Sequence, residues 1–371
     1  MTTLDPAGPA NGTPWEPPGP PRRRRRWPWV ILGLVVASIV VGAAGSAIRL
    51  PYYAIAPGDA LDVNDLVTIE GARQYPTHDE LLLLFVKQRA RVNVWRWIEA
   101  SIDPDIDLFE EPDFTGGADP ELVRAQSRRE MAASQVHAKK AALEILGYEV
   151  TRTEGVGVGA VLESMPAAGI VHEGDVVVAV DGRPVADHEA LVAAVHRRAP
   201  GDVVELRVRR GTRTVDVTVG TATGEDGRPV VGLLLLEEHY DLPVDVTIDT
   251  GRIGGPSAGL AMALAVIDAL TPGGLAGDLR VAVTGTIDAD GSVGGVGGLG
   301  QKALTARTVG ADLFLMPEDE SPKELERARA RAGDVEIVFV RTLDDALRAL
   351  EHAGGDPIGR GDEPAEVADA A

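Results

Sequence analysis

Two glycine-framed segments place a serine and a lysine where they could together cleave an acyl bond. Ser257 lies in GGPSAG, residues 254–259, and Lys302 follows the segment GSVGGVGGLGQ, 45 residues further along the chain. A neutral lysine can serve as the general base for a serine, but its pKa must then fall from about 10.4 to about 7 or 8. Burial among apolar neighbours has this effect on a lysine pKa. The pair predicts acyl transfer by Ser257 with Lys302 as its base.

A histidine-based triad is the first alternative, because GGPSAG also fits the G-x-S-x-G pattern of many hydrolases. In those enzymes the serine directly follows its strand and the histidine lies downstream. Here the strand VDVTI ends nine residues before Ser257, and only His352 comes after the serine. Only five of the 36 lysines and arginines are lysines, and a buried lysine can lose its proton whereas arginine stays charged. We therefore favour Lys302 as the base.

Nucleotide binding is a second alternative, since residues 295–300 read G-x-G-x-x-G. The dinucleotide fingerprint needs its first glycine at the end of a strand, but DADGSVG separates the strand VAVTGTI from this glycine. Gln301 stands where a phosphate-binding loop would carry its lysine. The chain has no cysteine, which excludes thiolate metal sites. We expect no nucleotide, no metal and no other cofactor.

Charge and hydropathy indicate an exported, membrane-anchored protein. The net charge is −21, to which the first 26 residues contribute +3 and the remainder −24; such an acidic body disfavours nucleic acid. Residues 27–48 lack charge and can span a bilayer, and Arg22 to Arg26 before them orient the N-terminus to the cytoplasm. We predict a cell-membrane protein with a disordered cytoplasmic tail (1–26), one transmembrane helix (27–48) and an extracytoplasmic catalytic body. A signal peptide cleaved near Ala47 is the alternative.

The elements that must position the serine and lysine predict an α+β multidomain chain. Residues 49–147 contain strand patterns and a helix over 127–147 that ends at Gly147. Residues 150–222 form a compact block of strands, residues 229–352 alternate strands with helices, and residues 353–371 are a second disordered tail.

The block 150–222 resembles a bacterial PDZ domain, on the residues SMPAAGIVHEGDVVVAVDGRPV. A PDZ domain binds an extended peptide beside a strand and captures its terminal carboxylate with backbone amides. The resemblance implies that the GVGVG stretch, with Gly157, Val158 and Gly159, is the carboxylate-binding loop. A role as a spacer or gate is the alternative.

The block 229–352 resembles the proteolytic domain of the Lon family, whose members are serine–lysine dyad peptidases. GGPSAG and TGTIDADGSVGGVGGLGQKALTA resemble the two motifs of that domain, and LFLMPEDE and VEIVFVRTLDDAL continue the resemblance. The resemblance implies that Ser257 is the nucleophile, Lys302 the base and Thr284 the residue that orients the lysine. Thr286 stands where the family usually carries an acidic residue.

The start of the helix after Ser257 predicts where an oxyanion would bind. The first amides of a helix lack partners within the helix and can stabilise a developing negative charge. We therefore expect backbone groups of Gly254, Gly255 and Ala258 to line the oxyanion site.

The whole chain resembles the bacterial membrane-anchored PDZ–Lon proteins, which have no ATP-driven motor. This resemblance implies an ATP-independent endopeptidase that cleaves unstructured or membrane-associated proteins, with residues 49–147 as the first part of the peptidase fold and the PDZ domain as an insertion. Assembly into a homo-oligomer is an expectation from the same family. The alternatives are a PDZ-bearing membrane scaffold with a latent or inactive peptidase domain, and self-cleavage as the main activity.

Overall fold

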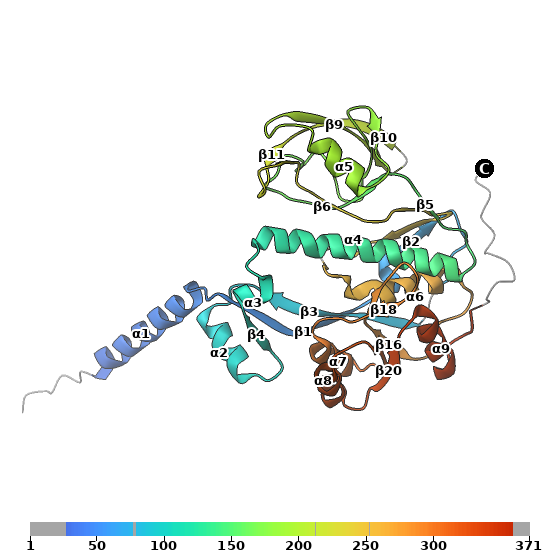
Figure 1. Ribbon diagram of the computed structural model, residues 1–371. Helices are drawn as coiled ribbons and strands as arrows, with labels where there is room; N and C mark the ends of the chain where they lie inside the picture. The colour runs from blue at the N-terminus through green and yellow to red at the C-terminus, as the bar shows by residue number, and fades with distance from the viewer. Residues whose placement is uncertain (1–26, 77–78, 212, 252, 359–371) are drawn as a thin grey trace, which may run out of the picture. The chain divides into compact units, whose positions relative to one another are not determined.

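The computed structural model describes residues 27–76, 79–211, 213–251 and 253–358 (Figure 1). The chain divides into two compact units, residues 1–48 and 49–371. The first contains helix α1 (Trp27–Ala47), which is long and apolar enough to cross a membrane. This helix coincides with the predicted span, although by length and composition a signal sequence would pass the same test. The predicted tail 1–26 and residues 359–371 of the predicted C-terminal tail lie outside the described residues.

The second unit is built on a six-stranded sheet with the order β20-β19-β16-β3-β1-β4. Three strands precede the PDZ-like block and three follow it: β1 (Tyr52–Asp62), β3 (Glu80–Arg89), β4 (Asp107–Glu110), β16 (Arg280–Val283), β19 (Leu313–Pro317) and β20 (Glu336–Val340). β1 runs antiparallel to β3 and β4, while β3, β16, β19 and β20 are parallel. Leu83 of β3 pairs with Val283 of β16, so residues 200 positions apart form the centre of one sheet.

Alternating side chains give this sheet two buried faces. Leu81 and Leu83 of β3 belong to one hydrophobic cluster, whereas Leu84 and Ala282 belong to another, as expected for a strand whose successive side chains point to opposite faces. The first cluster includes α4 (Pro120–Ile145), α6 (Gly259–Leu270) and α9 (Leu343–Ala353). The second includes α7 (Leu299–Thr308) and α8 (Pro322–Ala332). Figure 1 shows α4 and α6 on one side of the sheet and α7 and α8 on the other.

Helix α4 is longer than the sequence predicts. It begins at Pro120 rather than at residue 127, because the Asp119 side chain caps it by accepting a hydrogen bond from the Glu121 amide and proline is favoured in the first helical turn. It ends at Ile145, and Gly147 follows with a φ of 85°. Ser127, where the predicted helix begins, lies within α4 and contacts the segment that leads into α6.

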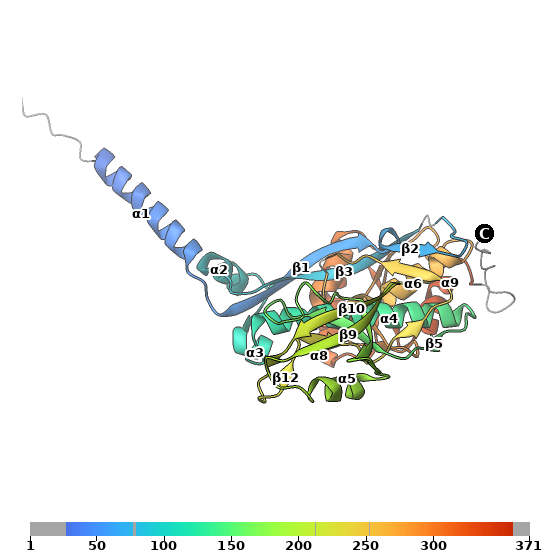
Figure 2. The ribbon, with the colours of Figure 1, turned by 90° about the horizontal axis from the view of Figure 1, so that it is seen from above.

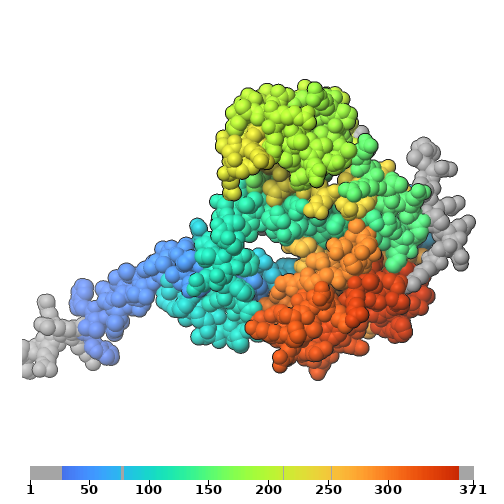
Figure 3. All heavy atoms as spheres, viewed as in Figure 1, coloured from blue at the N-terminus to red at the C-terminus, as the bar shows by residue number. Residues whose placement is uncertain are grey.

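The PDZ-like block has its own five-strand path, β10-β9-β7-β6-β13, and its own hydrophobic core. Its elements are β6 (Val156–Val161), β7 (Val176–Val180), β8 (Arg183–Pro184), α5 (His188–Val195), β9 (Val203–Arg210), β10 (Arg213–Gly220) and β13 (Leu233–Leu235). β13 lies beyond the predicted boundary at residue 222, yet it pairs with β6. These residues gather in one lobe, coloured yellow-green to yellow in Figure 3.

Shorter elements complete the second unit. They are η1 (Asn64–Leu66), β2 (Val67–Glu70), α2 (Val94–Ile102), α3 (Glu111–Thr115), β5 (Thr151–Arg152), β11 (Ala222–Thr223), β12 (Pro229–Val230), β14 (Tyr240–Asp241), β15 (Asp245–Ile248), η2 (Pro256–Ala258), β17 (Thr286–Ile287) and β18 (Val293–Gly294). Helix α2 packs near the start of β1 and against β4 (Figure 2). The mixture of helices and sheets confirms the predicted α+β class.

Candidate active site

Ser257 lies in η2, the short turn that leads into α6, and helix α4 holds this turn in place. The Gly255 amide donates to the Ser127 carbonyl at 3.0 Å, and the Ser134 hydroxyl donates to the Pro256 carbonyl at 3.0 Å. Gly255 has a φ of 86°, a backbone conformation that glycine adopts without steric cost. The turn is therefore fixed by backbone geometry and by two serines of a helix more than 120 residues upstream.

Two other glycines of GGPSAG are needed because neighbouring atoms come too close for a side chain. A Cβ atom at Gly254 would lie 2.5 Å from the Ser127 hydroxyl, and one at Gly259 would lie 2.7 Å from both Ile287 and the Ser134 hydroxyl. The Gly255 amide, which the sequence assigns to the oxyanion site, is occupied by the Ser127 carbonyl. Ala258 occupies the first turn before α6, where amides lack partners within the helix.

Lys302 is among the largest fully buried side chains of the described residues and is only 1% exposed. It lies in the first turn of α7, whose N-cap Gly298 has a φ of 70°. Burial lowers the pKa of Lys302 to about 7, while the carboxylate of Glu320 acts in the opposite direction. A pKa near neutrality lies in the range in which a lysine can serve as a general base.

Thr284 connects the lysine to the serine turn. The Lys302 amine donates to Thr284 Oγ1 at 2.8 Å, and the Thr284 hydroxyl donates to the Ser257 carbonyl at 3.3 Å. The Gly285 amide donates to the same carbonyl at 3.1 Å. Within the described part of the chain, the Ser257 hydroxyl makes no direct hydrogen bond to the Lys302 amine.

The strand that carries Thr284 is shorter than predicted. The pattern LRVAVTGTI predicts one strand, but β16 ends at Val283 and β17 begins at Thr286. Gly285, with a φ of 156°, separates them and lets the chain bend towards η2. Thr284 therefore stands at the end of a central strand with its side chain directed to the site.

Glu320 is a neighbour of the site that the sequence does not single out. Its Oε1 accepts a hydrogen bond from the Val296 amide at 2.5 Å, which ties the glycine-rich segment to the residues after β19. Burial is the main cause that raises the pKa of Glu320. The only sequence signal is its place in LFLMPEDE, at the end of a fully buried strand.

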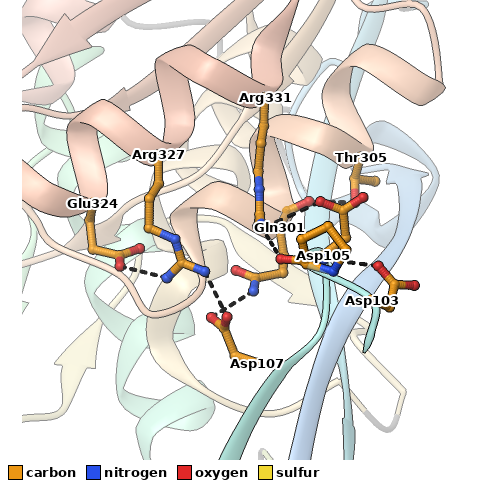
Figure 4. Close-up of polar contacts among 9 residues, drawn as sticks. Asp103, Asp105, Asp107, Gln301, Thr305, Glu324, Arg327 and Arg331 are labelled. Atoms are coloured by element: carbon orange, nitrogen blue, oxygen red, sulfur yellow. Dashed lines mark hydrogen bonds and ion pairs between the residues drawn. The ribbon is translucent and has the colours of Figure 1, made fainter. Parts of the chain in front are cut away.

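A polar network holds α7, and with it Lys302, against β4 and α8 (Figure 4). The Gln301 amide and the Arg327 guanidinium both donate to Asp107, at 2.7 and 2.6 Å, and Arg331 pairs with Asp105 at 3.3 Å. Burial alone would raise the pKa of Asp107, but the hydrogen bonds from Arg327 and Gln301 bring it below its usual range. Gln301, which takes the place of a phosphate-loop lysine in the sequence, thus fixes the position of helix α7.

Gly157, Val158 and Gly159 lie in strand β6 rather than in a loop. The Val158 amide donates to the Asp175 carbonyl at 2.8 Å, and the Gly157 carbonyl accepts from the Leu236 amide at 2.8 Å. β6 is paired on both sides, with β7 and β13, so it offers no free edge to a peptide. Gly157 and Val158 do line a cavity of about 410 Å³ between α4, β6 and residues 248–251 and 253. Their role in carboxylate capture stays a prediction.

Residues 236–352 match the family model of the C-terminal proteolytic domain of Lon protease (S16). The chain carries a Lon-type proteolytic domain. Ser257, Thr284 and Lys302 all lie inside it. Residues 135–221 match the family model of the PDZ domain, so a PDZ domain precedes the Lon-type domain. Strand β13, which completes the PDZ sheet, falls outside both matched ranges.

Curated relatives of the Lon-type domain are bacterial Lon proteases. That of Halothermothrix orenii is 30% identical over 172 residues, which are 42% of this chain and 21% of that protein. That of Trichlorobacter lovleyi is 42% identical over 112 residues, which are 29% of this chain and 13% of that protein. The match thus spans about a fifth or less of each relative. Among solved structures, the PDZ domain of an SdrC-like protein from Listeria innocua is 28% identical, with a TM-score of 0.22, over 24% of this chain and all of that one.

Proposed function

We propose that this protein is a serine endopeptidase in which Ser257 is the nucleophile and Lys302 the general base. The observation that carries the proposal is the fully buried amine of Lys302, whose pKa falls to about 7 and which is linked through Thr284 to the backbone of Ser257. Burial of a lysine amine costs free energy of folding when no carboxylate is hydrogen-bonded to it. The match to a proteolytic domain supports a catalytic reason for this burial.

The chemistry follows from these groups. The neutral Lys302 amine removes the proton of the Ser257 hydroxyl as the oxygen attacks the carbonyl carbon of a peptide bond. The resulting oxyanion is stabilised by backbone amides at the start of α6, with Ala258 better placed than Gly255, whose amide is already occupied. The protonated lysine then gives its proton to the leaving amine, and water resolves the acyl-enzyme with the lysine again as base. Thr284 orients the amine, and its hydrogen bond must be partly exchanged for one to Ser257 when substrate binds.

The setting of the active site indicates which substrates it takes. The Lon-type domain is preceded by a PDZ domain, and we infer that the PDZ domain recruits extended peptide segments. No phosphate-binding loop accompanies the domain in this sequence, and we infer cleavage of unstructured or membrane-associated proteins without ATP. Helix α1 supports membrane anchorage, and Arg22 to Arg26 before it favour a catalytic unit on the extracytoplasmic side.

One observation favours a second function. The Ser257 hydroxyl and the Lys302 amine do not bond directly in the described residues, which fits a PDZ-bearing scaffold whose peptidase is latent until a partner binds. Self-cleavage would appear as a shortened chain that is absent in Ser257→Ala.

The test uses the full chain reconstituted in vesicles, with an unfolded, fluorescently labelled protein as substrate and without ATP. Ser257→Ala and Lys302→Met should each lose at least about a thousandfold in rate, whereas Lys323→Met, which removes an exposed lysine of α8, should cleave like the wild type. If all four chains are equally inactive, the scaffold explanation replaces the peptidase one. Stimulation by ATP hydrolysis would contradict ATP independence.

A further inference from the structure

Four arginines line a cavity of about 260 Å³ at the start of helix α2: Arg49, Arg89, Arg91 and Arg96. All four are exposed. Arg96 pairs with Glu99 at 2.7 Å and Arg91 with Glu111 at 3.0 Å. Neither Arg49 nor Arg89 has an ion pair among the described residues, so the cavity keeps an excess of positive charge in a chain of net charge −21.

Helix α2 exposes apolar side chains beside this cavity. Ile98 is 41% exposed and Ile102 is 79% exposed; four residues apart, they lie on one face of the helix. Trp95, three residues before Ile98, is 42% exposed. Ala100 is buried, and the Trp97 ring lies 6.2 Å from that of Tyr52. The helix is therefore amphipathic, with an uncovered apolar face next to a cationic cavity.

This surface is tied to the residues that directly follow the apolar span. Arg49 comes immediately after the first unit, which ends at Ile48. The Leu50 amide donates to the Val92 carbonyl at 2.9 Å, and Arg49 forms a β-bridge with Asn93, the N-cap of α2. One residue of extended chain spans at most about 3.6 Å. If α1 crosses a membrane, the arginines cannot lie far from the membrane surface.

We propose that the arginine cavity and the apolar face of α2 dock onto anionic phospholipids at the membrane surface, with the guanidinium groups on lipid phosphates and Ile98 and Ile102 in the interfacial layer. The proposal rests on the membrane anchorage inferred above. Guanidinium groups bind phosphate oxygens in bidentate pairs, basic residues next to a span are attracted to anionic lipid, and amphipathic helices bury their apolar face between headgroups and acyl chains. A zwitterionic surface would satisfy the apolar face but not the charge.

Docking would also set the orientation of the catalytic domain. α2 packs against β4, and Asp107 of β4 holds Gln301 next to Lys302. A membrane contact at α2 is therefore connected to helix α7 through β4, which packs against α2 and binds Gln301.

The experiment uses the full chain in vesicles and a single introduced cysteine, which is unique because the chain has none. An environment-sensitive fluorophore at Ser101→Cys, on α2, reports burial through its emission and through quenching by brominated lipid chains. The same label at Val203→Cys, an exposed position of the PDZ domain, is the matched control. Vesicles contain either phosphatidylglycerol with phosphatidylcholine or phosphatidylcholine alone, and flotation measures membrane association of the chain.

We expect quenching at position 101 but not at 203 in the anionic vesicles, and weaker quenching in phosphatidylcholine. Each charge removed near an anionic surface should reduce the docked-to-undocked ratio about fivefold, so Arg49→Gln with Arg89→Gln should reduce it about 25-fold. Equal behaviour at both positions in vesicles that carry the chain would overturn the proposal.

The remaining outcomes separate docking from anchorage. If the chain floats with the anionic vesicles but not with phosphatidylcholine alone, the anchorage fails and the docking site is upheld. If it floats with neither, the docking proposal is overturned as well. A response to inorganic phosphate at constant ionic strength but not to vesicles would assign the cavity to soluble phosphate. A signal that follows protein concentration rather than lipid would assign the face to a second copy. Either result would overturn the proposal.

Discussion

Replacing Lys302 with methionine should abolish hydrolysis and at the same time stabilise the fold around α7. Folding lowers the pKa of this amine from about 10.4 to about 7. At about 1.36 kcal/mol for each pKa unit, holding the amine in the folded protein costs on the order of 4 kcal/mol. Methionine is of similar length and uncharged, and loss of the hydrogen bond to Thr284 costs about 1 kcal/mol. The expected net gain at neutral pH is about 3 kcal/mol.

The gain from Lys302→Met should depend on pH in one direction. The unfolded chain keeps the lysine proton up to about pH 10.4, whereas the folded protein releases it at about pH 7. Between these values the unfolded state binds more protons, so the wild type becomes more stable as the pH rises. The advantage of Lys302→Met is therefore largest at and below about pH 7 and decreases towards about pH 10.

Hydrogen–deuterium exchange over α7 in the full chain measures this effect as the free energy of local opening. Wild type and Lys302→Met are compared at about pH 7 and about pH 9, values within the window in which the proton is released. Lys323→Met is the control and should change the opening of α7 little. The reasoning is refuted if Lys302→Met opens more easily at neutral pH, or if its advantage is the same at both pH values.

Two further changes test the surroundings of the site and the PDZ core. Glu320→Gln removes the charge that raises the Lys302 pKa, so the rising limb of kcat/KM against pH should move to lower pH. The control Asp319→Asn, at an exposed neighbouring residue, should leave this limb in place. If the limb of Glu320→Gln stays in place or moves to higher pH, Glu320 does not have this role. Arg210→Met leaves Asp175, whose side chain is 1% exposed, without its ion pair and should destabilise the PDZ domain by roughly 3 kcal/mol. Burial acts to raise the Asp175 pKa, but Arg210 and the His172 amide hold it below its usual value. The stabilisation from the Arg210–Asp175 pair is complete above about pH 4 and is lost as the pH falls. Hydrogen–deuterium exchange rates over β7 in the wild type and in Arg210→Met should therefore become equal at acid pH. Equal exchange rates at neutral pH would show that the ion pair contributes no stability.

The features that the sequence predicts well are those encoded within a short stretch. The apolar span and the helix after Ser257 follow from local composition and glycine positions, and the structure has both. Ser257 stands out because it lies in the motif GGPSAG, and Lys302 because only five of the 36 lysines and arginines are lysines. In the structure, Thr284 accepts a hydrogen bond from the Lys302 amine and donates one to the Ser257 carbonyl.

The features that the sequence does not predict depend on contacts between distant segments. Gln301 and Asp107 are 194 residues apart, and Ser134 and Pro256 are 122 apart. Nothing near either partner marks the contact. β13 is a three-residue strand whose membership of the PDZ sheet is decided by its pairing with β6. The expected loop at Gly157 became a strand for the same reason, because backbone partners on both sides override the flexibility of glycine.

The pairing of β3 with β16 has a consequence for the order in which the molecule matures. A ribosome releases residues 80–89 long before residues 280–283. Strand β3 therefore stays unpaired on the side of β16 until some 190 further residues have emerged. The PDZ domain is finished during this interval and, once folded, shortens the open chain between the two strands, which lowers the entropy lost when they meet. The turn that holds Ser257, the helix that holds Lys302 and the sheet that aligns them are complete only after β20. A nascent chain therefore has no assembled candidate site until its last strand has emerged.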